Sequence, residues 1–360
     1  MRRLRVRSSS GEYAVHVGAG AWRALRQLEG YSSRFVLTES GLWKRWGRKF
    51  AREADWGPIN PVLIPSGETS KSLAMAGRVA GVLLERGADR RSLLVALGGG
   101  VVGDLGGFLA STYMRGIDCV QAPTTVLAQV DSAIGGKTAV NVLAMKNLVG
   151  TFCPPKLVVS EPSVLASLPP RAFQSGLQEV IKHAILSGPA FFGFLEKRLP
   201  GLGAGHGNRL EPVIARAAQV KVDVVSRDER EAGLRRVLNL GHTYGHALEE
   251  VTGYRRFLHG EAVGWGLLLI ARLAELVGCL DVHDGRRIAS LILRSSHLPP
   301  IRDLRWDRIQ ALLPRDKKAV GGKIHWVMPE SIGHVRVTPD VPADAVAAAF
   351  RDVQQGFWRE

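Results

Sequence analysis

The first part of the chain contains short apolar runs of strand length and a segment with helical spacing between two of them. Residues 13–17, 34–38, 61–65 and 92–97 are each apolar or alternating over the length of a strand. Between the third and fourth runs, the apolar residues of 72–86 recur every three or four positions, which predicts a helix. Strands that alternate with helices in this way predict a parallel, doubly wound sheet. We therefore expect an α/β, Rossmann-like N-terminal domain.

The pattern changes after about residue 161. Leu168-Pro-Pro170 interrupts the chain, and the segment 200–207 is a glycine-rich loop. The later apolar spacing predicts a mainly α-helical domain, with helices over 172–186, 212–228, 241–251, 260–277 and 286–294. Near the end we expect a hairpin of 323–328 with 334–337, then a helix from Pro342. The predicted domains are 1–168 and 169–360, with a site in the cleft between them.

The composition is that of a folded protein. The 360 residues are 46% hydrophobic and 22% charged, and the formal net charge is +15. The positive charge is spread along the chain, without a basic tract interleaved with aromatic residues, so we expect no nucleic-acid partner. We interpret the charge as steering of a small anion.

The cellular location is predicted from cysteines and apolar runs. Cys119, Cys153 and Cys279 lie far apart and form no CxxC motif, which suits a reducing compartment. The arginine-rich N-terminus has no apolar stretch behind it, so it is not a secretory signal. The longest apolar run, around 265–270, is too short to span a bilayer. We expect a cytoplasmic protein that does not bind membranes.

A glycine loop follows the predicted strand 92–97. Gly98, Gly100 and Gly103 fit the pattern G-x-G-x-x-G ahead of a helix, where backbone N–H groups can bind a pyrophosphate. A tight turn that only packs the strand against the helix is an equally good interpretation. The usual rule places a ribose-binding acid about twenty residues later, at Asp118.

Three of the ten histidines lie within eighteen residues, at His242, His246 and His259. On a helix, His242 and His246 would share one face, about 5–6 Å apart at Cβ, which is ligand spacing. Spacing alone does not say which of the two would bind a metal, and each histidine by itself could be inert. Glu179 is the natural carboxylate, although a surface pair with Lys182 is the simpler explanation for it. Two imidazoles and one carboxylate would leave a coordination position open, as in a catalytic zinc site.

Taken together, the motifs resemble the 3-dehydroquinate synthase family of sugar phosphate cyclases over nearly the whole chain. Examples are Gly98-Gly-Gly-Val-Val-Gly-Asp104 and His259-Gly-Glu261. The matching stretches are 98–104, 114–116, 123–125, 129–141, 146–147, 179–182, 228–235, 239–246, 259–261 and 316–318. The resemblance implies an NAD-dependent and zinc- or cobalt-dependent enzyme. It would convert 3-deoxy-arabino-heptulosonate 7-phosphate to 3-dehydroquinate and phosphate. A homodimer is the family expectation.

The resemblance also implies roles for individual residues. The metal ligands would be Glu179, His242 and His259, and the catalytic residues would be His246, Glu231, Lys137 and Arg235. NAD would contact Glu39, Glu68, Lys71, Gly98, Gly99, Gly100, Asp104, Thr124 and Thr125. The substrate would contact Arg115, Asp131, Lys146, Asn147, Lys182, Lys221, Asn239 and Lys317. Glu39 stands where the family usually has Asp, and this position replaces Asp118 as the expected ribose contact.

Three other functions compete with this interpretation. A related sugar phosphate cyclase would run the same chemistry on another sugar phosphate, but Lys146-Asn147, Arg235 and Asp316-Lys317 favour the heptulosonate. A metal-dependent polyol dehydrogenase would release NADH and would need fewer phosphate-binding cations. A basic nucleic-acid-binding protein would bind with a steep salt dependence.

Overall fold

The chain folds into two compact units. The computed structural model describes residues 1–143, 145–205, 207–313 and 324–359. The first unit contains Met1–Leu168 and Ala204–Arg230, and the second contains Pro169–Gly203 and Glu231–Glu360. One division between the units follows Leu168. Residues 204–230, which we expected in the second domain, group with the first unit.

The first unit is built on a seven-stranded sheet in the order β1-β2-β9-β6-β5-β3-β4. Its strands are β1 (Arg2–Ser8), β2 (Gly11–Val17), β3 (Arg34–Glu39), β4 (Val62–Ile64), β5 (Leu93–Gly98), β6 (Asp118–Pro123) and β9 (Leu157–Ser160). Strands β1 and β2 pair antiparallel, and all the other neighbours pair parallel. The carboxyl ends of the parallel strands therefore meet at one edge, where ligands bind in open α/β sheets.

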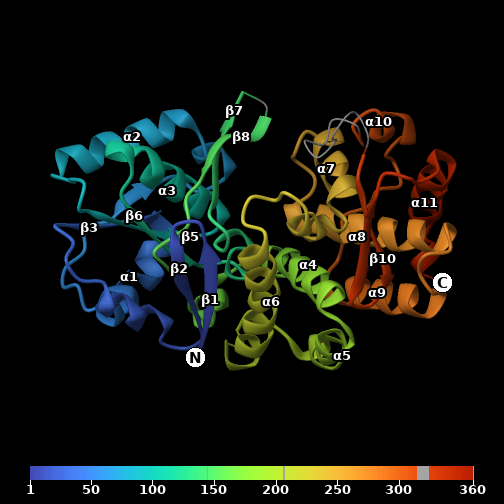
Figure 1. The fold of residues 1–360 in the computed structure, drawn as a ribbon, viewed down its shortest axis with the longest axis horizontal. Helices are drawn as coiled ribbons and strands as arrows, with labels where there is room; N and C mark the ends of the chain where they lie inside the picture. Colours follow the sequence, from blue (N-terminus) through green and yellow to red (C-terminus); the bar gives the residue numbers. More distant parts are fainter. Residues whose placement is uncertain (144, 206, 314–323, 360) are drawn as a thin grey trace. The chain divides into compact units, whose positions relative to one another are not determined.

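Helices cover both faces of this sheet (Figure 1). Leu94 and Ala96 of β5 pack with α2 (Leu73–Glu85) and α3 (Gly100–Thr112). The alternate residues Leu93, Val95 and Leu97 pack with η1 (Ala21–Gln27) and α1 (Ser40–Ala54). A strand buried on both faces needs an unbroken apolar run, and this is why residues 93–97 are all hydrophobic.

Three smaller parts complete the first unit. Strands β7 (Lys137–Val142) and β8 (Met145–Phe152) form a separate antiparallel ribbon. Helix α6 (Gly207–Arg227) packs against β1, where the Arg7 N–H donates to Ser226 Oγ at 3.1 Å. The remaining turns are η2 (Glu68–Ser70), η3 (Tyr113–Arg115), η4 (Ala128–Ser132) and η5 (Pro162–Ser167).

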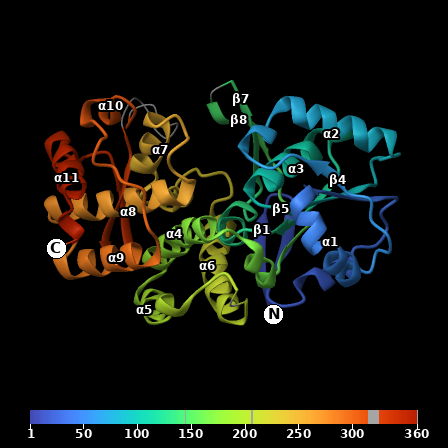
Figure 2. The same ribbon diagram turned by 180° about the vertical axis from the view of Figure 1, so that it is seen from behind.

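The second unit is mainly helical, as expected (Figure 2). Its described elements are α4 (Pro170–Ser187), α5 (Pro189–Arg198), η6 (Leu199–Gly201), η7 (Leu234–Asn239), α7 (His242–Val251), α8 (His259–Leu276), α9 (Val282–Ser295), α10 (Trp306–Gln310), β10 (Trp326–Ser331), β11 (His334–Thr338), α11 (Ala343–Gln355) and η9 (Phe357–Arg359). Helix α8 is the centre of this unit, and α4, α7, α9 and α11 pack around it. Among the described residues, no helix has both the length and the apolarity needed to cross a bilayer.

Candidate functional site

Three helices of the second unit each contribute one side chain to a cluster. Glu179 comes from α4, His242 from the first turn of α7 and His259 from the first turn of α8. Glu179 Oε1 lies 3.6 Å from His242 Nε2 and 3.5 Å from His259 Nε2. The Glu179 carboxylate is completely buried, and Lys182 Nζ pairs with its other oxygen at 2.5 Å. The surface Glu–Lys pair considered above is therefore wrong, because both partners lie in the interior.

Both imidazoles present Nε2 to Glu179 because their other nitrogens are held elsewhere. His242 Nδ1 lies 3.1 Å from the Leu240 carbonyl oxygen, and His259 Nδ1 lies 3.1 Å from Glu249 Oε2. In the neutral form of each ring, an N–H at Nδ1 donated to these oxygens would leave Nε2 as the nitrogen able to bind a cation beside Glu179. Desolvation lowers the pKa of His259, but the carboxylates of Glu249 and Glu179 outweigh it and raise that pKa to about 10.

This geometry suits a small divalent ion. Ligand atoms at 2.0–2.1 Å from a tetrahedral metal are separated by about 3.3 Å, close to the two measured separations. A buried carboxylate with two neutral imidazoles is a donor set that zinc and cobalt accept. His246 is not in this group, but it joins Glu249 and His259 in a second one whose ligand atoms also lie within 4.8 Å of one another.

Glycines bring the backbones of these helices together. Gly241 has φ 77°, and a Cβ there would lie 2.9 Å from the Leu267 nitrogen of α8. A Cβ on Gly260 would lie 1.8 Å from the Ser175 carbonyl oxygen of α4. Any side chain at either position would clash with the neighbouring backbone. These two glycines therefore allow α7 and α4 to approach α8 closely.

Other predicted residues of the second unit lie on or near η7. Asn239 Nδ2 donates to Glu231 Oε1 at 2.7 Å, and Glu231 has a left-handed φ of 62°. Arg235 is 2% exposed, so its guanidinium is buried. Lys317 lies outside the described residues.

The glycine loop in the first unit joins β5 to α3. A Cβ on Gly98 would lie 2.4 Å from Val102, and one on Gly103 would lie 2.7 Å from Gln121 Oε1. Packing of the strand against the helix therefore accounts for these two glycines. Gly99 and Gly100 are less crowded, with first contacts at 3.0 and 3.4 Å, and they lie at the N-terminus of α3. Their position is consistent with an anion site.

A polar network lies beside this loop. The ammonium of Lys71, which is 5% exposed, hydrogen-bonds to both Asp104 and Asn147. Asn141 accepts from the Asn147 N–H at 2.9 Å and donates to Glu68 Oε1 at 2.8 Å. Desolvation raises the pKa of Asp104, while the Lys71 ammonium lowers it. Lys71, Asp104 and Glu68 are predicted NAD contacts. Hydrogen bonds therefore link these three residues to Asn147, a predicted substrate contact.

The remaining predicted NAD contacts lie at the carboxyl ends of strands. Glu39 ends β3 and accepts a hydrogen bond from Ser66 Oγ at 2.7 Å. The Thr124 N–H, just after β6, donates to the Gly98 carbonyl oxygen at 2.9 Å. The Thr125 hydroxyl oxygen accepts from the Ala128 N–H at 3.1 Å. These positions share the sheet edge that carries the glycine loop.

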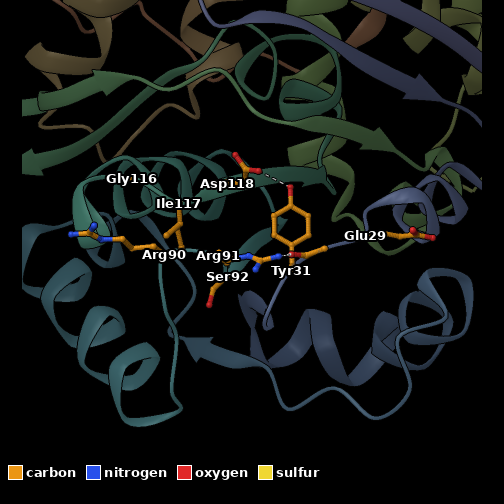
Figure 3. Close-up of a pocket in the computed structure, with 9 residues that line it drawn as sticks. Glu29, Tyr31, Arg90, Arg91, Ser92, Gly116, Ile117 and Asp118 are labelled. Atoms are coloured by element: carbon orange, nitrogen blue, oxygen red, sulfur yellow. Dashed lines mark hydrogen bonds between the residues drawn. The ribbon is translucent and has the colours of Figure 1, made fainter.

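Asp118 begins β6 and pairs with Leu93, at the opposite edge of the sheet from Gly98. A pocket of about 560 Å³ opens there, and its lining includes Tyr31, Arg91 and Asp118. Figure 3 shows the Tyr31 hydroxyl directed at Asp118, to which it donates at 2.6 Å. Asp118 therefore lies away from the glycine loop, and Glu39 stays the predicted ribose contact.

The predicted substrate residues of the first unit are mostly basic. Lys221 on α6 pairs with Asp131 of η4 at 2.6 Å. Lys137 and Arg115 are exposed, and Lys146 is half-buried. Arg115 and Asn147 have φ of 69° and 54°. Non-glycine residues in this region cost about 1–3 kcal/mol each, and such strain is concentrated at functional sites.

Comparison with known proteins identifies the family. Residues 61–175 match the 3-dehydroquinate synthase N-terminal domain, and residues 176–319 match the C-terminal domain. The chain belongs to the 3-dehydroquinate synthase family. A 3-dehydroquinate synthase from Thermodesulfovibrio yellowstonii is 46% identical over 352 residues, which cover 96% of this chain and 98% of that one. One from Solibacter usitatus is 42% identical, covering 88% and 89% of the two chains.

Solved structures agree with this family fold. A 2-epi-5-epi-valiolone synthase from Streptomyces hygroscopicus, with NAD⁺ and Zn²⁺ bound, has a TM-score of 0.86 and 27% identity, covering 95% of this chain and 97% of that one. A 2-deoxy-scyllo-inosose synthase, complexed with carbaglucose-6-phosphate, NAD⁺ and Co²⁺, has a TM-score of 0.86 at 24% identity, covering 98% and 99%. A glycerol dehydrogenase from Schizosaccharomyces pombe shares the fold more distantly, with a TM-score of 0.65 and 15% identity over 96% and 90%.

Sequence reasoning gave no role to two polar residues that form contacts here, Asn141 at the end of the matching stretch 129–141 and Glu249 after the stretch 239–246. Asn141 links Glu68 to Asn147, and Glu249 contacts His259. Glu249 could have been found, because it lies seven residues after His242 on the same helical face. No comparable pattern marks Asn141, because its contacts depend on the pairing of β7 with β8.

Proposed function

We propose that this protein is a 3-dehydroquinate synthase, which converts 3-deoxy-D-arabino-heptulosonate 7-phosphate to 3-dehydroquinate and phosphate. The observation that carries the proposal is the buried cluster of Glu179, His242 and His259 in a chain up to 46% identical to proteins of that name. The conversion is redox-neutral overall. A transient ketone acidifies the neighbouring C–H bond, phosphate is eliminated, and re-reduction precedes aldol closure of the ring.

The proposed cofactors are NAD and a divalent zinc or cobalt ion. The support comes from two related cyclases, whose structures contain NAD⁺ with Zn²⁺ or Co²⁺, and from the donor set described above. When bound, NAD supplies a reversible hydride acceptor and the ion supplies a Lewis acid for a substrate hydroxyl group. Glu179, His242 and His259 would hold the ion.

The other groups are assigned by their chemistry. His246 and Glu231 would transfer protons, with Asn239 orienting Glu231 through their 2.7 Å hydrogen bond. Lys137 and Arg235 would act on the reacting centre. For NAD, the proposed contacts are Glu39, Glu68, Lys71, Gly98, Gly99, Gly100, Asp104, Thr124 and Thr125. Lys71 would act there through its pair with Asp104.

The substrate carries a carboxylate and a phosphate, and the chain offers many cations for them. Ionised donors form stronger hydrogen bonds than neutral ones, and arginine can bind either anion through two bonds. The proposed substrate contacts are Arg115, Asp131, Lys146, Asn147, Lys182, Lys221, Asn239 and Lys317. Asp131 and Lys182 would help to position the sugar, because each already forms an ion pair.

The deciding experiment measures phosphate release from the heptulosonate 7-phosphate with catalytic NAD⁺ and added zinc or cobalt. Absorbance at the NADH band is followed in the same cuvette. Stoichiometric phosphate without accumulating NADH is the expected result. Accumulating NADH without phosphate would indicate a polyol dehydrogenase. The absence of both phosphate release and NADH formation would indicate a cyclase for another sugar phosphate.

We further propose a cytoplasmic homodimer that does not bind nucleic acid. All three cysteines are free thiols, as a reducing compartment favours. Light scattering coupled to size exclusion tests the dimer. A gel shift at low salt tests nucleic-acid binding, and a flat titration is expected.

A further inference from the structure

Two buried carboxylates that are not in the Glu179, His242 and His259 cluster are tied to His259. Glu249 on α7 is 3% exposed and Glu261 on α8 is 2% exposed. Burial of a carboxylate is costly unless it is paired or hydrogen-bonded, so the contacts of these two residues are informative. Both carboxylates act on the short segment in which α8 begins.

Glu249 fixes the ring of His259. Its Oε2 lies 3.1 Å from Nδ1, while Nε2 of the same ring lies 3.5 Å from Glu179 Oε1. An imidazole that binds a metal through one nitrogen commonly donates its other N–H to a carboxylate, which orients the ring and raises its basicity. Glu249 therefore stands behind His259 as such a partner.

Glu261 fixes the backbone that carries His259. Its Oε2 accepts from the Leu258 N–H at 2.7 Å, and this contact caps the first turn of α8. Arg171, at the start of α4, donates to the same carboxylate through Nε at 2.6 Å and Nη2 at 2.8 Å. Since α4 also carries Glu179, this two-bond contact joins the helix of one proposed ligand to the first turn of another.

We propose that Glu249 and the Arg171–Glu261 pair are positioning residues for His259. Glu249 sets the direction of the ring, and the pair sets where α8 begins relative to α4. Together they determine how tightly the ion is held, without binding it. The inference rests on the proposed function, in that it requires a metal at Glu179, His242 and His259.

A competing arrangement assigns Glu249 a direct role. His246, Glu249 and His259 also have ligand atoms within 4.8 Å of one another, so an ion could lie on that side of His259 instead. The cluster with Glu179 is favoured because two imidazole nitrogens lie within 3.6 Å of one buried oxygen. Loss of a positioning residue weakens binding, whereas loss of a ligand changes the coordination of the metal.

The test measures Co²⁺ affinity and the visible spectrum of the cobalt-loaded full-length protein. Glu249→Gln is expected to weaken Co²⁺ binding by about 10–100-fold while the band positions stay those of the wild type. Arg171→Gln should weaken it about 10-fold, and Arg171→Lys should recover part of that loss. His259→Ala should lose the cobalt spectrum. Because Arg171 is 57% exposed, its variants are expected to fold even if a change at buried Glu261 is not tolerated.

Glu196→Gln is the matched control. Arg287 of α9 donates to Glu196 of α5 through Nε at 3.1 Å and Nη2 at 2.8 Å, much like the Arg171–Glu261 pair, but among the described residues neither side chain contacts Arg171 or the cluster. Its Co²⁺ affinity should equal that of the wild type. Unchanged Co²⁺ affinity in Glu249→Gln and Arg171→Gln would overturn this inference but not the proposed metal site. A shifted cobalt spectrum in Glu249→Gln would have the same consequence. A wild-type protein that binds no Co²⁺ would overturn the proposed metal site itself.

Discussion

The replacement Gly260→Ala tests whether the close contact between α4 and α8 builds the proposed metal site. The new Cβ would lie 1.8 Å from the Ser175 carbonyl oxygen and 2.6 Å from its carbon. Carbon and oxygen atoms rarely approach closer than about 3.3 Å, so the two helices must part by about 1.5 Å at this point. Because the obstacle is backbone, no rotamer change can relieve it.

The expected cost follows from two terms. Overpacking of a core costs about 1–3 kcal/mol, and a backbone clash falls at the upper end. The Gly260 N–H also donates to Ser175 Oγ at 3.1 Å, and weakening that bond costs about 1 kcal/mol. Alanine's better helix propensity returns up to about 1 kcal/mol. The net loss is about 3 kcal/mol, or about 6–12 °C in melting temperature for a domain of this size.

Thermal unfolding by circular dichroism, together with a Co²⁺ titration, measures both consequences. Separation of the helices should also weaken Co²⁺ binding, since it moves His259 away from Glu179. The control is Gly193→Ala on α5, where a Cβ would meet nothing closer than 3.9 Å. That variant should be as stable as the wild type, or up to about 1 kcal/mol more stable. A Gly260→Ala protein that melts with the wild type and binds Co²⁺ equally well would refute the reasoning.

Three further predictions concern the first unit. Lys71→Met should weaken NAD binding and destabilise the unit by about 3 kcal/mol, because it leaves the Asp104 carboxylate unpaired. The double variant with Asp104→Asn should recover most of the stability but not the NAD affinity, as measured by chemical denaturation and by an NAD titration. Arg115→Gly should leave stability unchanged or raise it by up to about 1 kcal/mol, because glycine adopts the φ of 69° without strain, while loss of this proposed substrate contact raises the KM for the sugar phosphate. A loss of stability with an unchanged KM would count against this prediction. Burial raises the pKa of Cys119, so above about pH 9 its thiol ionises only in the unfolded state, and this residue lowers stability by about 1.4 kcal/mol per pH unit. Because burial also raises the pKa of Cys153, Cys119→Ala should reduce the slope of stability between about pH 9 and 10.5 by about that amount without abolishing it.

Local pattern predicted the elements that are buried on a regular face. The apolar run 92–97 became β5, and the helical spacing of 260–277 became α8 with a shift of one residue at each end. Several elements were not predicted, among them β1 and α5. In β1 only Val6 is buried, because the strand lies at the sheet edge and its arginines face outward. The predicted helix 172–186 ends within one residue of the end of α4, but the short helix α5, which begins directly after Gly188, was not predicted.

The grouping of α6 with the first unit could not be read from the sequence. Its amphipathic pattern says that one face is buried, but it does not say against which partner. The partner is set by contacts such as the hydrogen bond from the Ala19 N–H to Glu211 Oε2 at 3.2 Å, between residues 192 positions apart. Lys221 consequently lies beside Asp131 in the first unit. Distant polar contacts of this kind leave no periodic trace.

Local spacing does not predict whether His242 or His246 faces Glu179, because this depends on tertiary contacts. Both histidines lie on α7 and their rings are 5.5 Å apart, so one helix presents both to the same region. The choice depends on Gly241 and Gly266, since a Cβ on Gly266 would lie 1.9 Å from the Gly241 carbonyl oxygen. This contact seats the first turn of α7, and therefore His242, against α8, while His246 lies one turn further on. The glycines at the helix crossings thus decide which imidazole faces Glu179, and a change there should alter metal binding as surely as a change of ligand.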